Sequence, residues 1–366
     1  MAVRKIRKGK MAIRADSATC EAIAQPSAAL KVRAARQNGP MMRPIARTAF
    51  LRNPLKKVGE TPQNARVRHG LPSCSRRPLG AFHPADNPEF AMTITRQDID
   101  FLVATAKAAA DTEIMPHFSN LTAADIKTKA HASDFVTIAD TASEELIAKR
   151  VRAAWGDDFL FLGEEIMERQ PTLIDRLMEA PRAVVVDPID GTFNYANGVP
   201  AFAVIISVIE RGEVKGGIIY DPVRGDAACA IAGGGAFLVG NGRPDRPLRV
   251  APAAPLSDMQ GCAGWYYASP EERDRLLSGF SCAWGIMNYR CGGQEMRLLV
   301  DGRIHFCYYH KLSPWDHAAG WLIHREAGGY SALLDGSPYR PDLRAGGLLM
   351  TPDEASWNEL ATALRG

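Results

Sequence analysis

The stretch RAVVVDPIDGTFNYANG, residues 182–198, decides the fold of this chain. Its apolar run, Ala183 to Val186, predicts a buried strand. Pro188 disfavours helix for the residue before it and cannot donate to a sheet ladder, so we expect the strand to stop at Asp187.

Two carboxylates, Asp187 and Asp190, follow this strand three residues apart. Gly191 lacks the Cβ that keeps a ligand away from the backbone, and Thr192 stands where a helix or turn can begin. Hard acidic side chains beside a glycine amide and a hydroxyl suit Mg²⁺ together with a phosphate oxygen. The stretch therefore predicts a site for a metal ion and a phosphate group.

Length and composition restrict the class of protein. The chain has 366 residues, and its 46% hydrophobic and 23% charged residues are typical of a soluble globular protein with one large domain or two ordinary ones. The longest apolar stretch, residues 199–209, is far shorter than the roughly 20 residues of a membrane-spanning helix. Seven cysteines, an odd number without a CxxC pair, argue against a disulfide framework or structural zinc and favour a reducing compartment.

The net charge of +3 conceals a division of the chain. Residues 1–91 hold 18 Lys and Arg against 5 Asp and Glu (+13), whereas residues 92–366 hold 26 against 36 (−10). We interpret 1–91 as a basic, disordered leader: a start codon assigned upstream of the true start at Met92, a transit peptide, or an arm for nucleic acid or anionic surfaces. We expect an α+β metal-binding domain at 92–245 and an α/β domain that completes the active site at 246–366.

Hydrophobic periodicity predicts the order of the elements. One helix is expected from Thr95, with Thr95 or Asp98 as its cap, and a second from Ala139 to Ala153. A largely antiparallel sheet is expected next, with strands at 159–162, 183–187, 202–209, 214–220, 227–231 and 236–239. Beyond residue 258, strands near 259–265, 284–289, 304–309, 330–334 and 347–350 alternate with helices near 271–277, 294–300, 316–327 and 354–364, which indicates an α/β-type layer.

Acidic residues stand where these elements should begin or end. Asp140 and Asp316 are each ordinary N-caps when taken alone, and Glu164-Glu165 alone is an exposed loop pair. Asp187 resists such an interpretation, because a carboxylate at the end of an apolar strand needs an electrostatic partner.

Five segments together carry a resemblance to a known family. They are SDFVTIAD (133–140), GEE (163–165), DPIDGTFNY (187–195), GGGAFLVGNGRP (233–244) and WDHAAGWLIHREAGG (315–329). From residue 99 to about 350 the chain resembles the inositol monophosphatase family, the Mg²⁺-dependent, lithium-sensitive sugar-phosphate phosphatases, whereas residues 1–91 have no counterpart there. The resemblance implies a layered αβαβα sandwich, a cytoplasmic location and a homodimer.

The resemblance also implies a role for each matching position. Glu164, Asp187 and the carbonyl of Ile189 would hold a first Mg²⁺, and Asp187, Asp190 and Asp316 a second, within a set of two or three ions. Thr192, assisted by Asp140 and Glu164, would position and deprotonate the attacking water, and the Gly191 and Thr192 amides would bind phosphate oxygens. Glu165 and Lys129 would support the site.

Elementary chemistry agrees with this assignment. A phosphomonoester dianion repels a hydroxide nucleophile, so two cations about 4 Å apart are needed to neutralise the phosphate and stabilise the entering and leaving oxygens. Mg²⁺ takes hard oxygen ligands, which matches a set of carboxylates and a carbonyl. Several acids this close together repel one another. We therefore expect the metal-free site to be loose or partly protonated.

The positions that read the substrate depart from the family pattern. Tyr309 replaces a glutamate that binds ring hydroxyls in inositol-specific members, and residues 290–295, RCGGQE, replace the usual Gly-Ser/Thr-Ala-Ala segment. We expect Tyr309 and Glu295 to contact the substrate. Inositol phosphate is the first expectation among small polyol or sugar phosphates, and histidinol phosphate, a 3′-phosphoadenosine bisphosphate nucleotide and fructose 1,6-bisphosphate stay open.

Other interpretations explain less. Cys291 and Arg297 have the Cys-x5-Arg spacing of a cysteine-dependent phosphatase, but Glu295 inside that loop would repel phosphate. The glycine run 233–235 lacks the context of a dinucleotide site, and His310 and His324 lack metal-ligand spacing. A non-catalytic regulatory or nucleic-acid-binding protein that uses the basic leader would be expected to have lost metal ligands, and none is lost.

Overall fold

The structure is a computed structural model that describes residues 94–129 and 135–366. All of these described residues belong to one compact unit. The leader expected at 1–91 and the start expected at Met92 lie outside the described residues.

A seven-stranded sheet forms the first large layer, in the order β3-β4-β5-β6-β7-β8-β9. β3 and β4 are parallel, and every other neighbouring pair is antiparallel. The central strands carry mostly buried Val, Ile and Ala side chains, which suits a sheet covered on both faces. The strands are β3 (Leu160–Gly163), β4 (Ala183–Asp190), β5 (Ala203–Glu210), β6 (Glu213–Asp221), β7 (Asp226–Ile231), β8 (Gly235–Gly240) and β9 (Arg243–Pro247).

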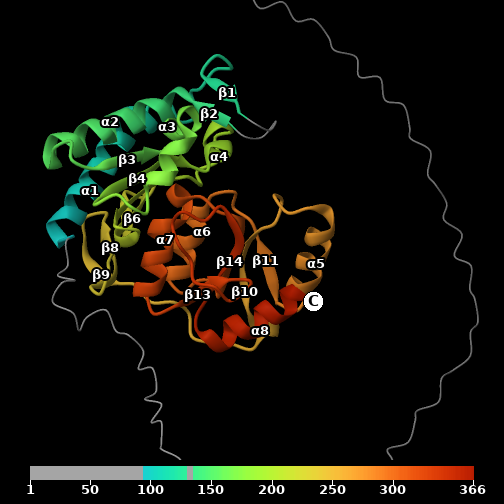
Figure 1. Ribbon diagram of the computed structural model, residues 1–366. Coiled ribbons are helices and arrows are strands. Elements are labelled where there is room, and N and C mark those ends of the chain that lie inside the picture. The colour runs from blue at the N-terminus through green and yellow to red at the C-terminus, as the bar shows by residue number, and fades with distance from the viewer. Residues whose placement is uncertain (1–93, 130–134) are drawn as a thin grey trace, which may run out of the picture. The chain divides into compact units, whose positions relative to one another are not determined.

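Helices α1 (Arg96–Ala109) and α2 (Ile138–Trp155) pack on one face of this sheet (Figure 1). Each begins with a capping box, made by Thr95 with Asp98 and by Thr137 with Asp140. Thr137 is therefore the N-cap of α2. Asp140, which taken alone has the character of an N-cap, is instead the third helical residue. The π-helical turn η3 (Ala110–Ile114) continues α1, and the short strands β1 (Ile126–Thr128) and β2 (Phe135–Thr137) pair antiparallel before α2.

A five-stranded sheet forms the second large layer, in the order β11-β10-β12-β14-β13. β10 (Gln260–Gly264) is parallel to β11 (Gly285–Met287) and β12 (Phe306–Lys311), and β14 (Ala345–Thr351) is antiparallel to β12 and β13 (Tyr330–Leu333). Helices α5 (Pro270–Phe280) and α8 (Glu354–Arg365) cover one face of this sheet, where their apolar side chains meet those of β12 and β14.

Helices α6 (Gly292–Val300) and α7 (Pro314–Glu326) lie between the two sheets (Figure 1). Leu299 and Leu322 from these helices share one core with Ile205 of the first sheet and Cys307 of the second. The layers therefore follow the order αβαβα, which confirms the predicted α+β sandwich.

The remaining elements are short. They are α3 (Glu164–Arg169), α4 (Thr192–Ala196) and the 3₁₀ turns η4 (Pro171–Arg176) and η5 (Leu256–Asp258). Across the described ranges, every helix is too short or too polar to cross a lipid bilayer.

Two strand predictions need correction. β4 does not stop at Asp187 but runs on to Asp190, with a shift in register against β5 between these residues. Pro188 is tolerated because β3 pairs with β4 only up to Val186. On that side of β4, no described strand stands beside Pro188 whose carbonyl groups would require a backbone N–H donor. β9 was not predicted, because Arg243–Pro247 is an exposed edge strand without an apolar pattern.

A buried histidine in α7 makes a pH-dependent contribution to stability. His324 is fully buried, its Nε2 lies 3.0 Å from the Thr351 carbonyl oxygen, and its Nδ1 has no hydrogen-bond partner within the described part of the chain. Burial lowers the pKa of His324 from 6.5 to about 4.

Because the unfolded chain takes up this proton near its ordinary pKa and the folded chain does not, the free energy of unfolding is expected to fall as the pH drops from 6.5 towards 4, by about 3 kcal/mol in all. Above pH 6.5 the histidine is neutral in both states and contributes no pH dependence. Chemical denaturation at several pH values checks this, with His324→Gln as the matched variant that keeps an N–H donor. Equal pH slopes for the parent and the variant would contradict the prediction.

Candidate active site

The acidic pair after β3 lies at the start of a short helix. Glu164 and Glu165 are the first residues of α3 rather than an exposed loop pair. The carboxylate of Glu144 in α2 accepts hydrogen bonds from the backbone N–H groups of Glu165 (2.9 Å) and Ile166 (3.1 Å) and so caps α3. Gly163 permits this approach, because a Cβ there would lie 1.9 Å from Oε2 of Glu144.

Sequence reasoning missed Glu144 as a positioning residue. By accepting the N–H groups at the start of α3, Glu144 fixes the direction in which this helix leaves β3. The available signal was Gly163, since a glycine directly before an acidic pair indicates a close backbone approach.

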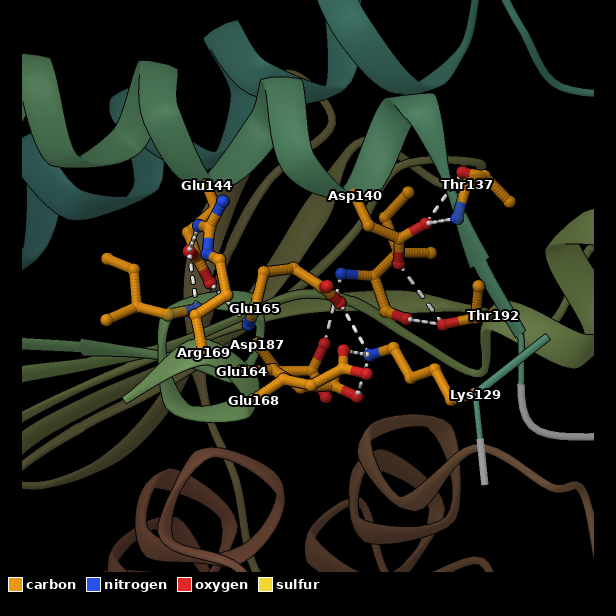
Figure 2. Close-up of polar contacts among 12 residues, drawn as sticks. Lys129, Thr137, Asp140, Glu144, Glu164, Glu165, Glu168, Arg169, Asp187 and Thr192 are labelled. Carbon is orange, nitrogen blue, oxygen red and sulfur yellow. Dashed lines mark hydrogen bonds and ion pairs between the residues drawn. The ribbon is translucent and has the colours of Figure 1, made fainter. Parts of the chain in front are cut away.

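Lys129 holds the acids of α3 together, as Figure 2 shows. Its Nζ lies 3.1 Å from Oε1 of Glu164, 2.7 Å from Oε1 of Glu165 and 3.5 Å from Oε2 of Glu168. Burial alone would lower the pKa of Lys129, but the charges of Glu164 and Glu165 outweigh it and raise that pKa. Lys129 is therefore a permanent cation at the edge of the acidic cluster.

Asp187 and Asp190 point from the end of β4 into the same region. Asp187 is 2% exposed, and its Oδ1 accepts the Ile189 N–H at 3.0 Å. Burial, followed by the charges of Glu164, Asp190 and Asp316, raises the pKa of Asp187 well above its usual range. Four carboxylates from three separate segments thus act on one another.

The beginning of α6 fixes the orientation of Asp190. Its carboxylate accepts hydrogen bonds from the backbone N–H groups of Gly292 and Gly293, and the Cys291 thiol donates to Oδ2 at 3.1 Å. Burial and the charge of Asp316 raise the pKa of Asp190 to about 7. Cys291 is buried, and burial beside Asp190 raises the pKa of its thiol well above 9.0, the opposite of what a nucleophilic cysteine needs.

Asp316 completes the acidic set from α7. It is the third residue of that helix, and Ser313 stands at the N-cap position that was expected for Asp316. Burial raises the pKa of Asp316, and the charge of Asp316 in turn helps to raise the pKa of Asp187. Glu164, Asp187, Ile189, Asp190, Thr192 and Asp316 all line one cleft of about 490 Å³.

Thr192 joins this cleft to α2. Its hydroxyl lies 2.9 Å from the Ile189 carbonyl oxygen and 3.2 Å from Oδ1 of Asp140, whose other oxygen accepts from Thr137 (Figure 2). Burial raises the pKa of Asp140 to about 7. A hydroxyl held between a carbonyl and a carboxylate can pass a proton between the cleft and Asp140.

Gly191 connects β4 to α4 in a backbone conformation that excludes other residues. Its φ is +87°, and a Cβ there would lie 2.9 Å from the Ala201 carbonyl oxygen and 3.0 Å from Cβ of Cys291. The glycine is therefore required both by the left-handed turn and by the packing against α6.

Comparison with known proteins shows the family to which this chain belongs. The model of the inositol monophosphatase family matches residues 95–365. The chain belongs to the inositol monophosphatase family. It is 31% identical over 208 residues to an inositol-1-monophosphatase of Rhizobium meliloti (56% of this chain, 74% of the relative) and 30% identical over 247 residues to the Nus factor SuhB of Xylella fastidiosa (65% and 82%). The crystal structure of the extragenic suppressor protein suhB from Bartonella henselae superposes with a TM-score of 0.62 at 27% identity, covering 73% of this chain and 98% of that one.

Membership of the inositol monophosphatase family implies a phosphatase of small phosphorylated substrates, and enzymes of this family are typically metal-dependent. The donor set in the cleft fits a divalent cation, because it consists of four carboxylates and a carbonyl, all hard oxygens. No three acidic, histidine or cysteine side chains in residues 94–129 and 135–366 already surround a common point. Glu164 contacts Lys129, Asp187 accepts the Ile189 N–H, and Asp190 accepts the Gly293 N–H.

The two substrate-binding residues expected from the family pattern do not lie in the cleft. Glu295 is 2% exposed and its Oε1 accepts the Tyr289 N–H at 2.8 Å, while Tyr309 is 7% exposed and packs against His317. Neither is among the described residues that line the cleft. The packing of α6 and β12 turns both side chains towards the core, and their contact with a substrate stays a prediction.

The structure places other residues on the wall of the cleft that sequence reasoning missed. They are Phe135, Phe193, Tyr266, Tyr267 and Arg290. The signal for Phe193 was its place directly after Thr192, and for the tyrosines the aromatic run 265–267 at the end of a predicted strand. The family pattern had instead indicated Glu295 and Tyr309 as the residues that contact the substrate.

Proposed function

We propose that this chain is a Mg²⁺-dependent phosphomonoesterase. The observation that carries the proposal is the meeting of Glu164, Asp187, Asp190 and Asp316, from β3–α3, β4 and α7, in one cleft. Glu164, Asp187 and the Ile189 carbonyl would hold one ion, and Asp187, Asp190 and Asp316 a second. When bound, the ions would neutralise the phosphate dianion and lower the pKa of a water molecule.

The chain's own residues would orient the reactants. Thr192 would accept a hydrogen bond or a proton from the attacking water. It would pass the proton to Asp140, whose Oδ1 lies 3.2 Å from the Thr192 hydroxyl. Glu164 would hold the same water from the other side. The backbone N–H groups of Gly191 and Thr192 would bind phosphate oxygens, since both residues line the cleft at the start of α4.

The alcohol half of the substrate is less closely defined. A small polyol or sugar phosphate, inositol phosphate first, follows from the names of the relatives. Histidinol phosphate or a 3′(2′),5′-bisphosphate nucleotide is the alternative on the same scaffold, because Glu295 and Tyr309 offer the cleft no group that reads ring hydroxyls. Lithium sensitivity, a homodimer and a cytoplasmic location stay predictions.

Phosphate release by the full chain tests the proposal. Glycerol 2-phosphate, a small ester without a ring, is incubated with the chain in excess Mg²⁺ and after removal of metal by a chelator. We expect chelation to lower the rate at least about 100-fold and added Mg²⁺ to restore it, because charge neutralisation contributes several kcal/mol to the transition state. Hydrolysis that survives chelation, or none with Mg²⁺ on any ester tried, would contradict the proposal.

A further inference from the structure

A short connection, residues 288–291, joins β11 to α6 and leads directly to the groups that contact Asp190. The Cys291 thiol donates to Oδ2 of Asp190 at 3.1 Å, and the backbone N–H groups of Gly292 and Gly293 donate to the same carboxylate. Asp190 belongs to the second metal position of the proposed function. Any movement of the connection would therefore change where this carboxylate points.

Two buried side chains hold both backbone polar groups of Tyr289 in this connection. Oε1 of Glu295 accepts the Tyr289 N–H at 2.8 Å, and Nδ2 of Asn194 donates to the Tyr289 carbonyl oxygen at 2.7 Å. Glu295 is 2% exposed and Asn194 is 5% exposed. Because both side chains are shielded from water, these hydrogen bonds are stronger than they would be at the surface.

Asn194 ties the connection to the β4 side of the cleft. It lies in α4, two residues after Thr192, and its Nδ2 also donates to the Ala201 carbonyl oxygen at 2.8 Å. An amide nitrogen carries two hydrogens, so it can serve both carbonyl groups. The start of α4 and the 288–291 connection are thus fixed relative to each other.

The backbone of Arg290 explains why the connection has to be held. Its φ is 55°, a left-handed conformation that is uncommon for a residue with a side chain. Its N–H donates to Oδ1 of Asn288 (2.9 Å), whose Nδ2 donates to the Ala263 carbonyl oxygen of β10 (2.8 Å). Such a conformation persists only where the surrounding contacts impose it. Without the bonds to Tyr289, we expect the connection to relax and Cys291 to shift.

Glu295 and Asn194 are both absent from the described residues that line the cleft. Any effect of these two side chains on the site must therefore pass through the backbone that they hold. Partners that orient the ligands of a metal ion commonly change its affinity 10- to 100-fold, although they never contact the ion.

We infer that Glu295 and Asn194 are positioning residues for the second metal position. By holding the backbone of Tyr289, they keep the Cys291 thiol and the first N–H groups of α6 on the Asp190 carboxylate. This inference rests on the metal site of the proposed function. It gives Glu295 a role other than contact with the substrate.

Metal binding without a substrate tests the role of Glu295. The full chain is titrated with Mn²⁺, which suits the same hard oxygen ligands as Mg²⁺ and whose free form is measured by electron paramagnetic resonance. Glu295→Met removes the acceptor but keeps the length of the side chain, and it should weaken the binding of one ion at least about 10-fold. Glu295→Gln keeps an oxygen for the Tyr289 N–H and should stay close to the parent chain.

Variants of Cys291 test the last contact of this path, and they do so even if Glu295→Met fails to fold. Cys291→Ala removes the donor to Asp190 and should weaken the same ion, whereas Cys291→Ser keeps a donor and should bind it like the parent. Cys229→Ala is the matched control, because it removes a buried thiol of β7 that does not line the cleft. A loss of melting temperature in a chelator without a loss of Mn²⁺ affinity, as expected for the control, would overturn the inference if Glu295→Met and Cys291→Ala showed it too.

A double variant tests whether Glu295 and Asn194 act through the same residue. Asn194→Leu removes the donor to Tyr289 and should also weaken Mn²⁺ binding. Combined with Glu295→Met, the loss of affinity should be smaller than the product of the two separate losses, since residues that share a partner are not additive. Fully multiplicative losses would overturn the shared path through Tyr289.

The outcomes separate this inference from the proposed function. Weakened Mn²⁺ binding by Glu295→Met and Cys291→Ala in a chain that hydrolyses no ester would retain the positioning role and reject the phosphomonoesterase. Hydrolysis by the parent chain, with Mn²⁺ affinity unchanged in both variants, would retain the phosphomonoesterase and reject the positioning role. A KM that rises by different factors for different esters in Glu295→Met, at unchanged Mn²⁺ affinity, would assign Glu295 to the substrate instead.

Discussion

Asp187→Asn is expected to lower turnover at least about 100-fold, the scale on which one preorganised electrostatic group contributes to catalysis. The charges of Glu164, Asp190 and Asp316 all act on Asp187. The amide keeps the shape of the side chain but removes the charge that would bridge the two metal positions.

The same substitution should not destabilise the metal-free fold. Burial and three neighbouring acids raise the pKa of Asp187, so its charged form is unfavourable in the folded chain and an uncharged amide relieves that repulsion. In a chelator, the variant should melt at or above the temperature of the parent chain.

Thermal melts with and without Mg²⁺ measure both effects. Mg²⁺ should raise the melting temperature of the parent chain, because a ligand that binds only the folded state stabilises it, and should raise that of the variant much less. Asp274→Asn, which changes an exposed acid of α5 that does not line the cleft, is the matched control. A variant that keeps full activity at saturating Mg²⁺ would contradict the role of Asp187.

Thr192→Val is expected to lower kcat about 100-fold or more, within the range of general acid–base contributions. Valine has the shape of threonine but lacks the hydroxyl that lies between the Ile189 carbonyl and Asp140. Thr192→Ser keeps the hydroxyl and should retain activity to within about 10-fold, since only the packing of one methyl group is lost.

Steady-state kinetics on one ester at saturating Mg²⁺ separates the explanations for this loss. A lost proton path lowers kcat with little change in KM, whereas a distorted phosphate site raises KM. Equal kcat values for the valine and serine variants would show that the hydroxyl takes no part in the reaction.

Much of this molecule was predictable from local patterns. Thr95 was named among the caps of α1 because Thr and Asp are helix-starting residues, and the left-handed turn at Gly191 follows from a glycine between a strand and a helix. The acids of DPIDGT lie at the end of their strand because the apolar run before them can only be buried. These features depend on neighbours within a few residues.

Other local patterns were misleading. Pro188 was expected to end β4, but the strand continues because its neighbour β3 has already ended. Glu295 and Tyr309 occupy positions next to the site in sequence, yet their side chains are buried by the packing of α6 and β12. Which side of an element faces a cleft depends on what packs against its other side.

The residues of the chain thus set the helices, the strands and the kind of chemistry, since periodicities and acid-rich motifs are properties of short segments. The αβαβα layering was expected only from the family resemblance. Only the packing of two sheets around α6 and α7 brings Glu164, Asp187 and Asp316 to one cleft and places Tyr266, Tyr267 and Arg290 in its lining. The physical reason is separation along the chain: more than a hundred residues lie between Glu164 and Asp316, and no local rule states where two such distant segments meet.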